Sequence, residues 1–69
     1  MNKVDKRLQK YYVTNKYKGF CLLREHNYKL FGQVKMTFTN GEKEIYATGP
    51  FKEATLKKIF DQIDKYIVD

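Results

Sequence analysis

The side chains in this sequence that are capable of catalysis or metal binding are few and scattered. His26 follows Glu25, Cys21 is the single thiol, and Asp61 and Asp64 stand three residues apart. A histidine beside a carboxylate suits general-base chemistry, a thiolate suits nucleophilic attack, and paired carboxylates bind divalent cations. We expect instead a solvated histidine in a turn, a packed thiol in a strand and two aspartates on a solvated helix face. The sequence therefore predicts no catalytic residue, metal site or cofactor, and a protein that is not an enzyme.

The single cysteine also bears on the cellular compartment. One thiol makes no intramolecular disulfide, and together with the single histidine it makes no zinc site. No apolar run approaches the roughly 20 residues of a membrane-spanning helix. We therefore expect a cytoplasmic protein that has no membrane partner.

The net charge of +6 is concentrated in the first half of the chain. Residues 1–35 contain nine basic and two acidic side chains, whereas residues 36–69 contain five basic and six acidic ones. A charge asymmetry of this kind indicates a basic surface that attracts polyanions or acidic proteins. Twelve of the fourteen cations are lysine, so solubility and a compositional bias toward lysine are the alternative explanation.

The elements that would position these side chains begin with a strand over residues 28–39. Apolar and polar side chains alternate along it, which is typical of a strand with one buried face. Asn40-Gly41 follows, the pair that favours a two-residue hairpin loop, and residues 42–48 form the returning strand. Such a loop predicts that Thr39 pairs with Glu42 and that Met36 pairs with Ile45. Lys35 would then lie opposite Tyr46, and Val34 opposite Ala47.

An earlier strand is predicted over residues 17–24, joined to the next through a turn at residues 25–27. Its register has two alternatives. A three-residue loop directs Phe20 and Leu22 toward the core, and a four-residue loop directs Cys21 and Leu23 there instead. In either case two apolar side chains of this strand lie on the face away from the core, together with Phe31. A cluster of exposed apolar side chains of this kind is usually covered by another segment or by a partner.

From about Lys52 the apolar spacing changes to that of a helix. Its apolar stripe comprises Leu56, Ile59, Phe60, Ile63 and Ile67. We expect this stripe to pack on Leu30, Val34, Met36, Ile45 and Ala47. Residues 2–12 form either a short helix through Val4, Leu8 and Tyr11 or a basic arm. The predicted fold is α+β: a three-stranded antiparallel meander and one C-terminal helix in residues 17–69, after a basic N-terminal segment over residues 1–16.

Two surfaces of this predicted fold are candidates for binding. The face of the sheet away from the helix combines cations with aromatic rings, which neutralise phosphates and stack on bases. Its candidate residues are Lys18, Arg24, Lys29, Phe31, Gln33, Lys35 and Tyr46. The N-terminal segment adds Lys6, Arg7 and Lys10, either as an arm that orders on binding or as a cap over Phe31.

The order of three antiparallel strands, the step Gly49-Pro50-Phe51 and a single packing helix resembles the plant ethylene-response-factor domains and the integrase arm-binding domains over residues 17–67. That resemblance implies a sheet laid in the DNA major groove. The chain lacks the tryptophan and arginine pattern of the plant domains, so no base-reading residue is carried over. The chain also resembles the small, lysine-rich accessory proteins of phages and mobile elements.

These observations favour a non-enzymatic binding protein that contacts nucleic acid through its basic sheet face. The alternative is a module or inhibitor that docks on a host or phage protein through an apolar patch around Phe31. A homodimer through the same face, or through the edge strand at residues 42–48, is the third hypothesis.

Overall fold

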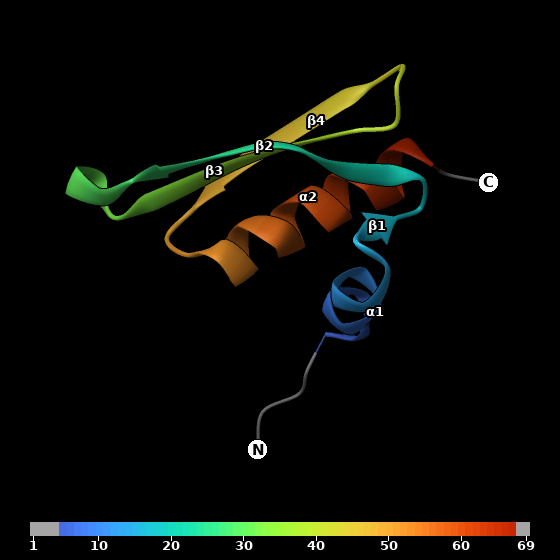
Figure 1. Cartoon of the computed structure of the whole chain (residues 1–69), viewed down its shortest axis with the longest axis horizontal. Helices are drawn as coiled ribbons and strands as arrows, with labels where there is room; N and C mark the ends of the chain where they lie inside the picture. Colours follow the sequence, from blue (N-terminus) through green and yellow to red (C-terminus); the bar gives the residue numbers. More distant parts are fainter. Residues whose placement is uncertain (1–4, 68–69) are drawn as a thin grey trace.

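The computed structural model describes residues 5–67, which form an antiparallel sheet with helices on one side of it (Figure 1). The strands lie in the order β1-β2-β3-β4. The elements are α1 (Lys6–Thr14), β1 (Lys16–Tyr17), β2 (Phe20–Tyr28), the 3-10 helix η1 (Lys29–Phe31), β3 (Gln33–Thr39), β4 (Glu44–Gly49) and α2 (Lys52–Tyr66). The α+β class, the antiparallel sheet and the C-terminal helix are confirmed. The sheet has four strands within the described residues, however, and not the predicted three.

The predicted strand over residues 28–39 is interrupted near its start. β2 runs through the predicted turn at residues 25–27 and ends at Tyr28, and the connection to β3 is η1 followed by Gly32. Gly32 has a φ of 59°, a left-handed conformation that glycine adopts without a steric penalty. This connection lies at the tip of the β2–β3 hairpin, so Leu30 is 95% exposed and its predicted place in the core is wrong.

The hairpin between β3 and β4 has a four-residue loop in place of the predicted two-residue one. Asn40 keeps a negative φ, and its side-chain Oδ1 accepts the backbone N–H groups of Glu42 at 2.9 Å and Lys43 at 2.8 Å. Thr39 therefore pairs with Glu44, two residues beyond the prediction. A shift of two residues leaves every side chain on its predicted face, because side chains alternate with period two.

A two-residue turn does occur, but between β1 and β2. Lys18 and Gly19 both have positive φ values, 49° and 85°, and they connect the pair Tyr17 and Phe20. Positive φ at both central residues is the geometry of a tight hairpin turn. Phe20 is fully buried, as the first of the two predicted registers requires, but Leu22, which that register also directs to the core, is exposed. Cys21 and Leu23, the inward residues of the second register, are exposed as well. A bulge shifts the register between Leu22 and Arg24.

The core lies between the sheet and α2. The helix stripe is confirmed, with Leu56, Ile59, Phe60 and Ile63 fully buried, and Ile67 lies at the partly exposed end. On the sheet it meets Phe20, Val34, Met36, Phe38 and Ile45, with Ala47 packed at the side. Because the burial of apolar surface is the dominant favourable term in folding, this layer is the main source of stability.

The N-terminal segment forms a helix, α1, that extends the same core. Leu8 and Tyr11 are buried, whereas Val4 lies outside the described residues. The ring of Tyr11 is 5.8 Å from that of Phe60, and Tyr17 stacks on Phe60 at 4.3 Å. Asp5 caps α1 by accepting the N–H of Arg7 at 2.9 Å, as capping aspartates do. α1 and β1 are therefore held beside α2, on the same side of the sheet (Figure 1).

The sheet and α2 approach each other closely at Gly49. Thr55 of α2 is fully buried, and its hydroxyl lies 3.0 Å from the carbonyl oxygens of Val34 and Phe51, which are its hydrogen-bond acceptors. A Cβ at position 49 would lie 2.6 Å from the Thr55 Oγ1. The end of β4 therefore requires a residue without a side chain.

We expect Gly49→Ala to lower the free energy of unfolding by about 1–3 kcal/mol, because the added methyl group must displace a buried hydrogen-bonded hydroxyl. Urea denaturation measures the change. Thr48→Ala, in the same strand, is the control and should have a much smaller effect. Equal stabilities of Gly49→Ala and the wild type would contradict the packing of Thr55 against this strand.

Candidate nucleic-acid interface

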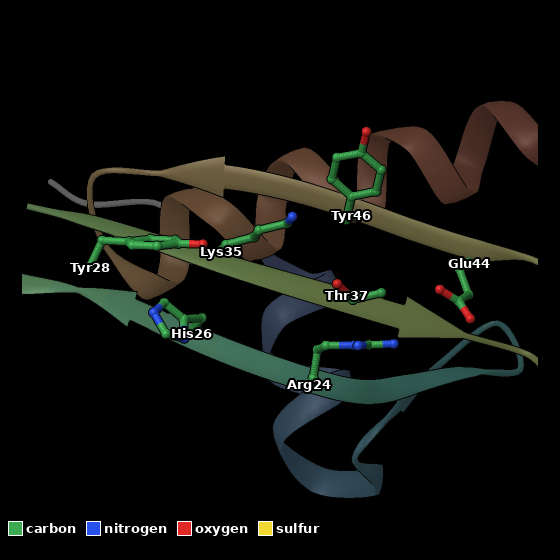
Figure 2. Close-up of a pocket in the computed structure, with 7 residues that line it drawn as sticks. All are labelled: Arg24, His26, Tyr28, Lys35, Thr37, Glu44 and Tyr46. Atoms are coloured by element: carbon green, nitrogen blue, oxygen red, sulfur yellow. The ribbon is translucent and has the colours of Figure 1, made fainter. Parts of the chain in front are cut away.

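The face of the sheet opposite α2, here called the outer face, is not covered by any described element. Both α1 and α2 lie on the other side (Figure 1). The N-terminal helix is therefore not a cap over Phe31, which was one of the two alternatives. A shallow hollow of about 410 Å³ lies on the outer face, and Figure 2 shows the side chains that line it. It is lined by Arg24, His26, Tyr28, Lys35, Thr37, Glu44 and Tyr46.

Strand pairing brings these side chains into rows across the sheet. Arg24 lies beside Thr37, which lies beside Tyr46, and in the next row His26 lies beside Lys35. Thr37 is only 6% exposed although it belongs to this face, because longer side chains surround it (Figure 2). Long side chains shield short ones in this way on an exposed sheet.

Cations and rings are in contact on the outer face. The Lys35 ammonium lies 4.9 Å from the centre of the Tyr46 ring, within the range of a cation–π interaction. The rings of His26 and Tyr28 are 4.2 Å apart. Tyr46 remains 61% exposed and stands off the sheet in Figure 2, so its ring is accessible to a ligand.

The charge of this hollow is modest. Arg24 and Lys35 supply two cations, and Glu44 at the turn end supplies one carboxylate. Gln33 is also on this face, opposite Tyr28, and adds a neutral amide. Of the predicted outer-face set, the structure thus places Arg24, Gln33, Lys35 and Tyr46 on one surface. Sequence reasoning missed two residues of this face: His26, which we expected in a turn, and Tyr28, which we expected on the apolar side at the start of a strand.

Lys29 and Phe31 lie instead in η1, at the tip of the β2–β3 hairpin. Phe31 is 75% exposed, and it borders a second hollow with Gln33, Pro50 and Lys58. Together with Leu30 it forms an apolar projection at one end of the sheet. This exposed pair, Leu30 and Phe31, is here called the apolar tip.

Arg7 and Lys18 are drawn into ion pairs on the helix side of the molecule. Arg7 contacts the carboxylates of Asp5 at 2.9 Å, Asp61 at 2.8 Å and Asp64 at 3.1 Å. The Lys18 ammonium lies 2.8 Å from Asp64. Asp61 lies on an exposed helix face, as predicted, and Asp64 is partly buried. Both aspartates pair with cations, which the sequence did not indicate.

These contacts shift the acid–base equilibria of the network. Hydrogen bonds from Arg7 hold the pKa of Asp5 below its usual value. Partial burial alone would raise the pKa of Asp64, but hydrogen bonds from Lys18, Tyr17 and Arg7 outweigh it and lower the pKa. Burial, together with a 2.6 Å hydrogen bond donated to Asp64, raises the pKa of Tyr17 to about 12. The carboxylates of Asp5 and Asp64 are therefore ionised at neutral pH, whereas the Tyr17 hydroxyl keeps its proton.

A second basic surface lies beside this network, between α1 and β1. It is a groove of about 580 Å³ and is here called the basic groove. Its lining comprises Lys6, Arg7, Lys10, Thr14, Lys16, Tyr17 and Lys18. Lys6 and Lys10, predicted as binding candidates, therefore lie here and not on the outer face. Lys16 joins them because the chain reverses direction after α1.

The structure does not bring together Glu25 and His26, the pair considered for general-base chemistry. Glu25 and His26 are adjacent in β2, so strand alternation directs them to opposite faces of the sheet. Cys21 is exposed, against the expectation of a packed thiol, and its Sγ lies 3.8 Å from the carbonyl oxygen of Thr39. No group of three or more metal-binding side chains is found within residues 5–67. Neither described helix is long and apolar enough to cross a bilayer.

The free edge of β4 is occupied by side chains of α2. The Gln62 amide donates to the carbonyl oxygen of Tyr46, and the Lys58 ammonium donates to that of Thr48, both at 2.9 Å. Carbonyl groups that already accept hydrogen bonds are poor templates for another strand. This arrangement disfavours a homodimer formed by pairing β4 edges.

Comparisons with models of protein families, with curated proteins and with solved structures give no match to this chain.

We expect Arg7→Ala to lower the free energy of unfolding at about pH 7 by about 1–2 kcal/mol, because three carboxylates lose a partly exposed partner. The lowered pKa values of Asp5 and Asp64 contribute stability above their unfolded value of about 3.9, and that stability is lost as the pH falls through the folded values. The difference between wild type and variant should therefore shrink below about pH 4. Urea denaturation across this range tests it, with Lys6→Ala as the control. A difference independent of pH would contradict the ionic role of Arg7.

Proposed function

We propose that the protein binds single-stranded nucleic acid through its outer face, with little dependence on base sequence. The observation that carries the proposal is an uncovered sheet face on which solvent-exposed rings lie beside cations, with the Lys35 ammonium 4.9 Å from the Tyr46 ring. Proteins that bind single strands without sequence preference combine stacking rings with a positive surface. The outer face has both features.

The residues of the outer face suit the binding of single strands better than the sequence-specific recognition of a duplex. Arg24 is the one arginine that lines the hollow, and bidentate contacts from arginine are the commonest means of identifying guanine in the major groove. Tyr28, Tyr46 and His26 offer planar surfaces to any base. Lys35 and Arg24 are then available for phosphates, which carry no sequence information.

We expect Lys35→Glu to weaken binding to a thymidine oligomer of about 12 nucleotides by about tenfold, because it replaces a phosphate contact by a repulsive charge. Fluorescence anisotropy measures the affinity. Lys52→Glu is the matched control: the same charge change on an exposed residue of α2, away from the outer face. Equal losses in the two variants would show that only net charge matters.

The salt dependence provides a further readout of the same complex. A phosphate-driven complex with a single strand should weaken with a log–log slope of roughly −0.7 per phosphate neutralised. Lys35→Glu should reduce the steepness of that slope, and Lys52→Glu should not. If no DNA or RNA oligomer shifts the backbone resonances even at low salt, the proposal is wrong.

A second candidate function, docking on a protein, is favoured by the apolar tip. Leu30 is 95% exposed and Phe31 is 75% exposed, and adjacent large apolar side chains at a protruding hairpin are typical of binding anchors. Lys29 precedes them, so an acidic rim on the partner would complement the tip.

We expect Phe31→Ser to change the melting temperature by less than about 2 °C, because the ring contributes little buried area. If the tip anchors a protein partner, the same substitution should abolish co-purification with that partner while leaving oligonucleotide affinity unchanged. Phe20→Ser, which alters a fully buried ring, is the contrasting variant and should prevent stable folding. A large loss of stability in Phe31→Ser would contradict the exposed position of the tip.

A further inference from the structure

The basic groove has features that the outer face lacks. Five cationic side chains line it, and none of its lining residues is acidic. Two of the five, Arg7 and Lys18, are paired with Asp5, Asp61 and Asp64. Lys6, Lys10 and Lys16 form no ion pair with the residues that the structure describes. Three unneutralised ammonium groups therefore remain on one concave surface.

The fold holds these lysines together. The Thr14 hydroxyl accepts the backbone N–H of Lys16 at 3.2 Å and lies 3.0 Å from the carbonyl oxygens of both Lys10 and Lys16. Asn15 follows in a left-handed conformation with a φ of 61°, which reverses the chain after α1. β1 is thereby turned back alongside α1. Like charges that repel one another are kept close by backbone geometry, which raises the local attraction for an anion.

The groove and the outer face point in different directions. The outer face lies on the side of the sheet away from α2, whereas α1 and β1 lie on the side of α2 (Figure 1). The sheet and the aromatic core separate the two surfaces. A ligand segment on one surface is consequently remote from a segment on the other.

From this arrangement we infer that the basic groove is a second phosphate-binding site, and that one molecule bridges two separate segments of nucleic acid. The inference rests on the proposed function of the outer face. The two sites differ in chemistry. The outer face offers rings for stacking with few cations, whereas the groove offers lysines, which bind phosphates as point charges. The second segment is therefore held by its backbone, without regard to sequence.

The test is a co-capture experiment with two thymidine oligomers of about 12 nucleotides, one on beads and one fluorescent. Thymidine strands do not pair with each other, so fluorescence on the beads reports bridging by the protein. We expect the wild type to capture the fluorescent strand at low salt. Lys10→Glu/Lys16→Glu should retain binding to the bead-bound strand but capture at least about fivefold less of the second strand.

Two further variants serve as controls. Lys43→Glu/Lys52→Glu makes the same charge change on exposed residues outside both surfaces and should capture the second strand nearly as well as the wild type. Lys10→Gln/Lys16→Gln removes the two charges without reversal and should show the same direction of loss, which keeps the test valid if the glutamate variant folds poorly.

The outcomes separate the two proposals. If the wild type binds the bead-bound strand but captures no fluorescent strand, bridging is wrong and the proposed function stands. Undiminished bridging by both groove variants would overturn the role of the groove and indicate a protein dimer instead, which sedimentation of the free protein would detect. Failure of the wild type to bind any strand would overturn the proposed function and bridging together.

Discussion

The packing around Phe60 is the interaction on which the rest of this structure depends. Its ring stacks on Tyr17 at 4.3 Å and lies within 5.8 Å of Tyr11 and 6.2 Å of Phe38. One residue of α2 thus joins α1, β1 and β3 in a single apolar cluster. Aromatic rings bury more area than other side chains, and their tilted and stacked pairs add about 0.5–1.5 kcal/mol each. Because the cluster holds α1 on the helix side, the opposite face of the sheet is left uncovered.

The same cluster decides how the positive charge is distributed. α1 brings Arg7 against the carboxylates of α2, where the guanidinium also lies 5.8 Å from the Phe60 ring. The lysines of α1 and β1 then line one groove, and the cations of β2 and β3 lie beside rings on the outer face. The cations of the first half of the chain are therefore distributed among three distinct environments. They are a neutralised network, a lysine groove and an aromatic face, and they suit different interactions.

The elements with regular side-chain periodicity were predictable, because periodicity is a local property. The apolar stripe of α2 and the inward side of β3 and β4 follow directly from spacing. The inward set includes Val34, Met36 and Ile45. The turns were not predictable in the same way. Asn40-Gly41 has the composition of a two-residue turn, yet the Asn40 side chain accepts two backbone amides and produces a longer loop. Gly32 continues an alternating pattern but adopts a left-handed conformation, so Leu30 leaves the sheet.

The alternation of side chains along β3 and β4 determined by itself which of their residues share the outer face. Lys35 and Tyr46 were placed there correctly although the β3–β4 register was displaced, because a shift of two residues preserves the face. Arg24 was a candidate for this face, but the register of its strand was left open between two alternatives. Only the tertiary structure decided which cations remain available for a ligand. Lys18 and Arg7 contact Asp64, which lies 57 residues after Arg7, and no local pattern encodes a contact between residues so distant in sequence. Tertiary packing likewise placed α1 beside α2, because the rings that fix it come from four different elements.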